Sequence, residues 1–152
     1  MNTRKMLPLA LLYAGEEHHI DGRTRFQKLI FLMQKEGNLD QLDPADTYRF
    51  EPYDYGPFSS SLYDDLDDHI ERGLIEDSME EIDEEDDIVK YEYRLEQEGR
   101  EFVEDRLSDS EIKRIVREAE RIVKEYGSLR LPELIDVVYS KYPKYAENSV
   151  LR

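Results

Sequence analysis

The stretch from Phe50 to Ile75, F-E-P-Y-D-Y-G-P-F-S-S-S-L-Y-D-D-L-D-D-H-I-E-R-G-L-I, predicts a turn, a helix and the start of a strand in succession. Its first nine residues are rich in aromatic side chains and are interrupted by Pro52 and by the pair Gly56-Pro57. A Gly-Pro pair tolerates turn geometry and disfavours a helix before it. We therefore expect a short extended segment that runs into a tight turn.

The second part of this stretch predicts an amphipathic helix. Leu62, Leu66 and Ile70 recur every four residues, and any of the three serines at 59–61 could cap the first turn. Gly73 is in the position of a helix-ending glycine, and a strand would begin directly after it. A turn, a helix, Gly-Leu-Ile and a strand are typical of the third helix of a winged helix-turn-helix and of the wing that follows.

The rest of the chain gives a consistent order of elements. Apolar periodicity predicts further helices at 4–15, 23–35, 96–107, 108–126 and 131–142. Alternation predicts strands at 48–52, 74–82 and 88–95, the last two flanking an acidic hairpin tip at 83–87 that we expect to be exposed and mobile. Two caps are predicted: a capping box with Ser108 at the N-cap and Glu111 at N3, and Pro132 at N1 of the last helix. Pro8 fits the first helix only within its first turn, which suggests a later start.

These elements predict an α+β, mostly helical fold. Residues 1–107 would form a winged helix-turn-helix domain, and residues 108–152 would add two C-terminal helices that pack on it or form a dimer. The 152 residues are enough for one domain with a real core. The chain has no cysteine, and we recognise neither a secretory leader nor a membrane span, so we expect a soluble cytoplasmic protein.

The charge is distributed unevenly. Residues 37–110 carry six basic and twenty-six acidic side chains, whereas the two flanking segments are each slightly basic, and the net charge is −16. An acidic, lysine-poor and cysteine-free chain is typical of adaptation to high salt, where the Debye length falls to about 3 Å and self-repulsion is screened. We therefore hypothesise a halophilic habitat, which leaves open whether the acidity is an adaptation or a functional surface.

The chain also resembles a known family. The residues that carry the resemblance are R-F-Q-K-L-I-F-L at 25–32, F-x-x-Y-x-Y-G-P-F-S at 50–59, the Gly-Leu-Ile helix end, and Y-R-L at 93–95 before Glu98-Gly99. They are similar to the YwgA-like proteins and to the phage-associated, Panacea-type antitoxin domain. The resemblance covers 23–107 and implies a non-catalytic regulator, either an antitoxin-like domain that holds a protein partner or an uncharacterised relative.

No residue pattern predicts catalysis, a cofactor or a metal site. His18 and His19 are adjacent and read as surface loop residues, and the serines at 59–61 are explained by helix capping, with no oxyanion loop nearby. The acidic run 80–87 lacks the spaced ligands and central glycine of a calcium loop. We therefore predict that the protein is not an enzyme.

Nucleic-acid binding is the alternative that a winged helix suggests, with its third helix in the major groove. That helix carries five acidic side chains against Arg72, so a DNA duplex should repel it. A basic stripe on the helix at 108–126 could bind nucleic acid or could be a solvated helix face: Lys113, Arg114, Arg117, Arg121 and Lys124. An acidic mimic of DNA is a third hypothesis.

The turn at residues 53–58, which we call the aromatic turn, is the predicted contact surface for a protein partner. Binding hot spots are enriched in tyrosine, and a rigid backbone beside an exposed tyrosine favours such a role. Arg25 and Lys28 are three residues apart on one helix, so they should share a face and either hold this turn or meet the partner. The predicted surface comprises Arg25, Gln27, Lys28, Tyr53, Tyr55, Gly56, Pro57 and Phe58.

Overall fold

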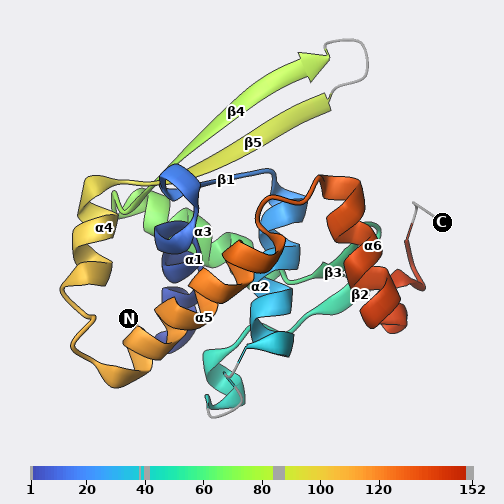
Figure 1. Cartoon of the computed structure of the whole chain (residues 1–152). Coiled ribbons are helices and arrows are strands. Elements are labelled where there is room, and N and C mark those ends of the chain that lie inside the picture. Colours follow the sequence, from blue (N-terminus) through green and yellow to red (C-terminus); the bar gives the residue numbers. More distant parts are fainter. Residues whose placement is uncertain (1, 38, 40–41, 84–87, 150–152) are drawn as a thin grey trace.

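A computed structural model describes residues 2–37, 39, 42–83 and 88–149 of the chain (Figure 1). The helices are α1 (Thr3–Ala14), α2 (Arg23–Glu36), α3 (Ser60–Glu71), α4 (Gln97–Glu104), α5 (Ser110–Tyr126) and α6 (Leu131–Lys141). The strands are β1 (His19–Asp21), β2 (Glu51–Tyr53), β3 (Gly56–Phe58), β4 (Ile75–Asp83) and β5 (Ile88–Leu95). Short 3-10 helices are η1 (Glu16–His18), η2 (Pro44–Asp46) and η3 (Pro143–Ala146). The predicted α+β, mostly helical fold is confirmed.

Helix α2 lies at the centre of the molecule. Every residue from Phe26 to Met33 is buried, so the helix is covered on all sides. Helices α1, α5 and α6 pack against it, and so does β3 of the aromatic turn. This is the central position that its apolar circumference predicts.

The three-stranded sheet has the order β1-β5-β4 and is antiparallel throughout. Strand β1 lies between the helices predicted at 4–15 and 23–35, where no strand was predicted, and its Ile20 pairs with Tyr93 of β5. The pairing continues past the strand, because Gly22 N–H donates to the Tyr91 carbonyl at 2.6 Å. Strand β1 thus ties the connection between α1 and α2 to the base of the β4–β5 hairpin.

The β4–β5 hairpin projects well beyond the helices (Figure 1). Its two strands agree with the predicted ones within a residue or two, and at its base Tyr93 and Leu95 are buried. Farther out, β4 exposes Glu76, Asp77 and Met79. The predicted acidic tip falls largely on 84–87, which lie outside the described residues.

Both ends of α3 match the sequence. Ser59 is the N-cap residue, although its side chain makes no capping hydrogen bond. At the other end Gly73 has φ +77°, Gly73 N–H donates to the Ile70 carbonyl at 3.0 Å and Leu74 N–H to the His69 carbonyl at 2.9 Å. This pair of bonds is the Schellman motif that a glycine after a helix predicts.

Three predicted helix starts are wrong in detail. Helix α1 begins at Thr3, with Asn2 as its N-cap, so Pro8 lies inside the helix rather than in its first turn. The N-cap of α5 is Asp109 and not Ser108, because the Asp109 carboxylate accepts hydrogen bonds from the amides of Glu111 and Ile112. Pro132 is the second residue of α6 rather than the first.

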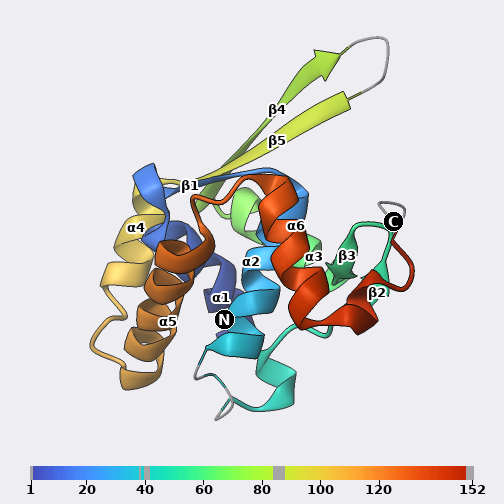
Figure 2. The same cartoon turned by 45° about the vertical axis from the view of Figure 1, so that its right-hand side comes forward.

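Helices α5 and α6 pack on the rest of the described chain. The apolar face of α5 is buried against α1 and α2, and α6 lies beside α2 and β3 (Figure 2). The buried residues of this region belong to the same core as those of the first three helices. No helix in the described ranges is both long and apolar enough to cross a bilayer.

Candidate functional site

Strands β2 and β3 form a two-stranded ribbon, and the aromatic turn, residues 53–58, comprises the end of β2, the connecting loop and β3. Tyr53 pairs with Gly56, so the connecting loop is the two residues Asp54 and Tyr55. Gly56 has φ +104°, a conformation that side-chain-bearing residues rarely adopt. The ribbon lies beside α6 at the edge of the helical body (Figure 2).

Two tyrosines of the aromatic turn are exposed. Tyr53 is 55% and Tyr55 53% exposed, and Met79 at 67% is the other large hydrophobic side chain exposed to this degree among the described residues. The Tyr53 ring stacks on Phe58 with centroids 5.0 Å apart, and Phe58 contacts Tyr63 edge to face at 5.5 Å. These contacts hold Tyr53 in place while leaving half of its surface open.

Two buried side chains of α2 anchor the turn. The Lys28 ammonium donates to the Tyr55 carbonyl. The Gln27 amide makes a reciprocal pair with the backbone of Ser59: its nitrogen donates to the Ser59 carbonyl at 2.9 Å and its oxygen accepts from the Ser59 amide at 3.0 Å. Both residues therefore hold the turn, a role that the sequence suggested for Lys28 but not for Gln27, and being buried they offer little surface to a partner.

The buried ammonium of Lys28 is an electrostatic anomaly. The side chain is 1% exposed, and burial lowers its pKa to about 8 because the charged form loses its hydration. A hollow of about 120 Å³ lies beside it, between α2 and the aromatic turn. The hollow is lined by Thr24, Gln27, Lys28, Tyr63 and the turn residues Tyr53 and Tyr55 to Phe58.

Residues 139–149 pack against the aromatic turn, a contact that was not predicted from the sequence. A Cβ built on Gly56 would lie 3.0 Å from the Tyr139 ring, so α6 packs directly on the turn backbone. Tyr139 OH donates to Ser149 Oγ at 2.7 Å, and Asn148 Nδ2 donates to the Pro52 carbonyl at 3.5 Å. Residues 139–149 therefore form part of the platform that positions the aromatic turn.

Arg25 lies apart from this site. Its guanidinium donates to the Leu129 carbonyl at 2.7 Å, in the connection between α5 and α6. It lines a different cleft, of about 600 Å³, together with residues of β1 and of that connection. Arg25 and Lys28 thus bind different parts of the chain and do not meet on one face, contrary to the spacing argument.

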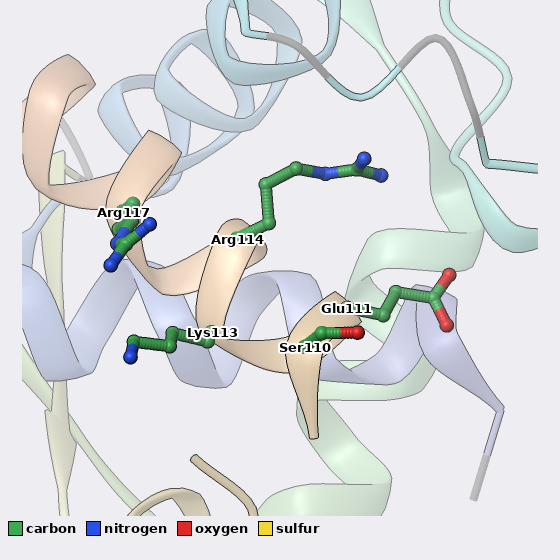
Figure 3. Close-up of a pocket in the computed structure, with 5 residues that line it drawn as sticks. All are labelled: Ser110, Glu111, Lys113, Arg114 and Arg117. Carbon is green, nitrogen blue, oxygen red and sulfur yellow. The ribbon is translucent and has the colours of Figure 1, made fainter. Parts of the chain in front are cut away.

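The predicted basic stripe on α5 is divided. Figure 3 shows Arg114 extending away from Lys113 and Arg117, which lie closer to each other. Arg121 donates to the Glu118 carboxylate at 3.0 Å and to the Glu36 carbonyl. Lys113, Arg117 and Lys124 are exposed, and the first two line a shallow hollow with Arg114, Ser110 and Glu111.

Cations near the start of α1 and α2 are used within the fold. Arg4 makes two hydrogen bonds to the buried Asp65 carboxylate, at 2.9 and 3.0 Å, and Lys5 pairs with Asp68 at 2.7 Å. The Arg23 guanidinium lies 3.9 Å from the centroid of the Tyr91 ring and 4.6 Å from that of Tyr63. These three cations therefore contribute little basic surface to an approaching phosphate backbone.

The outer face of α3 remains acidic. Asp65 and Asp68 face α1, and the exposed acids of the helix are Asp64, Asp67 and Glu71. The exposed acids of β4 continue this surface onto the hairpin. In a major-groove docking mode this face would meet the DNA phosphates with like charge.

The serines at the start of α3 and the histidine near its end do not form a catalytic pair. The Ser59 backbone is held by Gln27, and the buried His69 ring bonds through Nε2 to the Lys5 carbonyl at 2.8 Å. Burial lowers the pKa of His69. In the part of the chain that the structure describes, no three metal-ligating side chains cluster.

The chain matches a known family. Residues 26–143 match the family described as antitoxin SocA-like, Panacea domain. The match runs from Phe26 in α2 to the end of α6 and so includes the aromatic turn, α3, the hairpin, α4 and α5. No curated protein and no solved structure matched the chain. Because the match covers more than half of the sequence, the chain belongs to the SocA-like antitoxin family that carries the Panacea domain.

Proposed function

We propose that this antitoxin-like chain is a non-enzymatic regulator that acts by binding a protein partner, with the aromatic turn as the contact surface. The observation that supports this most directly is the pair of half-exposed tyrosines, Tyr53 and Tyr55, on a backbone that buried Lys28 and Gln27 hold fixed. Aromatic side chains on a rigid support lose little entropy on binding, and they dominate binding hot spots. Family membership supports the same class of function.

The proposed architecture is a winged helix. Strand β1 lies between α1 and α2 in the chain, and the β4–β5 hairpin follows α3. In the sheet β1 pairs with β5, so the strand order is β1-β5-β4. A helix, a strand, two helices and a hairpin in this order are what a winged helix contains. The β4–β5 hairpin would then be the wing.

This architecture also supports the alternative, a DNA-binding transcriptional regulator, and the exposed Lys113, Arg117 and Lys124 of α5 would be its phosphate contacts. The acidic outer faces of α3 and β4 weigh against the usual docking mode of such a regulator. The acidic faces favour instead a partner protein with a basic surface, or the hypothesis that this surface imitates DNA. Protein binding therefore remains the first proposal.

A pull-down from the native host, at its own salt concentration, tests the proposal. We expect the wild-type chain to retain one protein in stoichiometric amount, and the double variant Tyr53→Ala/Tyr55→Ala to lose it. Met79→Ala is the matched control, because Met79 is also a large exposed hydrophobic side chain but lies on the hairpin. Recovery of DNA fragments with a shared sequence, unaffected by the tyrosine changes, would instead establish the DNA-binding alternative.

A further inference from the structure

Lys28 carries a buried charge that no carboxylate of the described chain neutralises. The residues next to it in the chain are Gln27 and Leu29, and among the described residues its hydrogen bond goes to the Tyr55 carbonyl. Across residues 2–37, 39, 42–83 and 88–149, no Asp or Glu makes an ion pair with it, and desolvation alone accounts for its lowered pKa. An ammonium has three donors, and the described residues supply an acceptor for one of them, the Tyr55 carbonyl.

The hollow beside Lys28 has the size and lining of a pocket that could bind one side chain of another protein. Its volume of about 120 Å³ exceeds the ~30 Å³ that a water molecule occupies in the liquid, but it is far too small for a drug-sized ligand. Lys28 is the charged residue of the lining, and Gln27 is already engaged by Ser59. The other lining residues are Thr24, Gly56, Pro57 and four aromatic residues, Tyr53, Tyr55, Phe58 and Tyr63.

We propose that this hollow receives one acidic side chain of the protein partner, an Asp or Glu whose carboxylate pairs with the Lys28 ammonium between the surrounding aromatic rings. The inference rests on the proposed function, because it assigns the hollow to the same contact surface as Tyr53 and Tyr55. A basic side chain would be repelled by Lys28, and an amide would leave the buried charge uncompensated.

Such a contact would be a hot spot. Burial costs the Lys28 ammonium its hydration whether or not the partner is present, so the partner's carboxylate gains a charge-assisted hydrogen bond to a group that is already desolvated. The partner's acidic side chain must itself lose water, which limits the gain and makes it sensitive to geometry. The acidic residue should therefore contribute more to the binding free energy than the residues next to it in the partner sequence.

A phage-displayed random 12-residue peptide library, selected on the full wild-type chain, provides the test. We expect the enriched peptides to carry Asp or Glu at one fixed position. Changing that residue to Asn or Gln should weaken binding to the wild type at least tenfold. The same change should alter binding to Lys28→Met by less than threefold, because the methionine side chain fills the space of the lysine stem without its charge.

The two proposals fail in different ways. Peptides that lose affinity on Tyr55→Ala but show no conserved acid would overturn the acidic-side-chain inference and leave the aromatic turn as a binding surface. A selection without any Tyr55-dependent peptide would overturn the function proposed for the turn as well. If acetate alone binds with the same affinity as the selected peptides and displaces them, the occupant is a free small carboxylate and the inference is wrong.

A pH titration of the wild type covers the case in which Lys28→Met does not fold. The preference for the acidic peptide over its amide twin should fall by up to tenfold per pH unit above about 8, as Lys28 loses its proton. The other titratable groups around the ammonium are the phenols of Tyr53, Tyr55 and Tyr63, and of Tyr139 on α6; burial raises the pKa of Tyr63. A preference that stays constant from pH 7 to 10 would contradict the pairing with Lys28.

Discussion

At the scale of single residues, Gly56 shows why the aromatic turn has one backbone conformation. Its φ of +104° is strained for any residue with a side chain, and an added Cβ would lie 3.0 Å from Tyr139 and 3.2 Å from the Lys28 nitrogen. Gly73 has φ +77° but no heavy atom within 4 Å of the same position. The two glycines therefore separate the cost of the backbone conformation from the cost of a steric contact.

We expect Gly56→Ala to lower the free energy of unfolding by about 2–3 kcal/mol and Gly73→Ala by about 1 kcal/mol, because strain applies to both positions but crowding only to the first. Urea unfolding of the two variants and the wild type measures the difference. Equal losses would mean that Tyr139 and Lys28 move aside without cost. Gly56→Ala should also weaken partner binding, since it displaces the anchor of Tyr55.

Lys28 predicts an unusual dependence of stability on pH. Its pKa is about 8 in the folded protein and about 10.5 in the unfolded chain, so between these values the unfolded chain binds more protons. The free energy of unfolding should therefore rise with pH across this window, by an amount on the order of 3 kcal/mol relative to Lys28→Met. Below pH 8 the penalty for burying the charge is fully present.

Urea unfolding of both chains at pH 7, 8, 9 and 10 measures this difference. All other ionisable groups are common to the two proteins, so their contribution cancels when the variant is subtracted. A difference that does not change with pH would show that the Lys28 ammonium is hydrated in the folded protein.

At the scale of elements, helices α1 and α3 are held together by a polar network rather than by apolar contact alone. The buried Asp65 carboxylate accepts hydrogen bonds from Arg4 and, at 2.7 Å, from the hydroxyl of Tyr48. This use of Asp65 also removes one acid from the outer face of α3. The network fixes the orientation of the helix that begins directly after the aromatic turn.

Asp65→Asn should therefore lower the free energy of unfolding by roughly 2–3 kcal/mol, because Arg4 and Tyr48 lose a charged acceptor in a partly buried site. Asp64→Asn is the matched control: it makes the same chemical change one residue earlier, on the exposed side of α3. We expect Asp64→Asn to leave the urea midpoint nearly unchanged. Similar losses for both variants would indicate that only the helix charge matters.

The elements that the sequence predicted well have a strong local signal. The four-residue spacing of Leu62, Leu66 and Ile70 located α3, and alternation located β5. Strand β1 has three residues, too few for alternation to be visible. The choice between Ser108 and Asp109 as the α5 cap could not be made from the sequence, because both side chains offer an oxygen acceptor and rank alike as N-cap residues.

The candidate site was predictable in part for the same reason. The aromatic turn and its Gly-Pro pair are visible in the sequence, and so are Gln27 and Lys28 on the neighbouring helix. The support from Tyr139 and Asn148 joins segments about 90 residues apart, so it leaves no local pattern. The burial of Lys28 reverses what its residue type predicts, since lysine is almost never fully buried without a partner.

At the scale of the whole molecule, the net charge of −16 is reduced locally but not removed. The pairs of Arg4 with Asp65 and of Lys5 with Asp68 neutralise the inner side of α3, whereas Asp64, Asp67 and Glu71 remain exposed. Such a surface repels itself, and the repulsion is screened as the Debye length shortens with salt. The hypothesis of a high-salt habitat can therefore be tested through stability.

We expect the urea midpoint at pH 7 to rise steadily as KCl increases from 0.1 to 2 M. The variant Asp64→Asn/Asp67→Asn/Glu71→Gln removes three exposed charges without touching the internal pairs, so its midpoint should depend less on KCl and should be higher than that of the wild type at 0.1 M. Full stability of the wild type at low salt, with no response to KCl, would reject the habitat hypothesis. The acidity would then be better explained as a surface for a basic partner, and the same triple variant should lose affinity for the protein recovered from the host while the tyrosines of the aromatic turn stay intact.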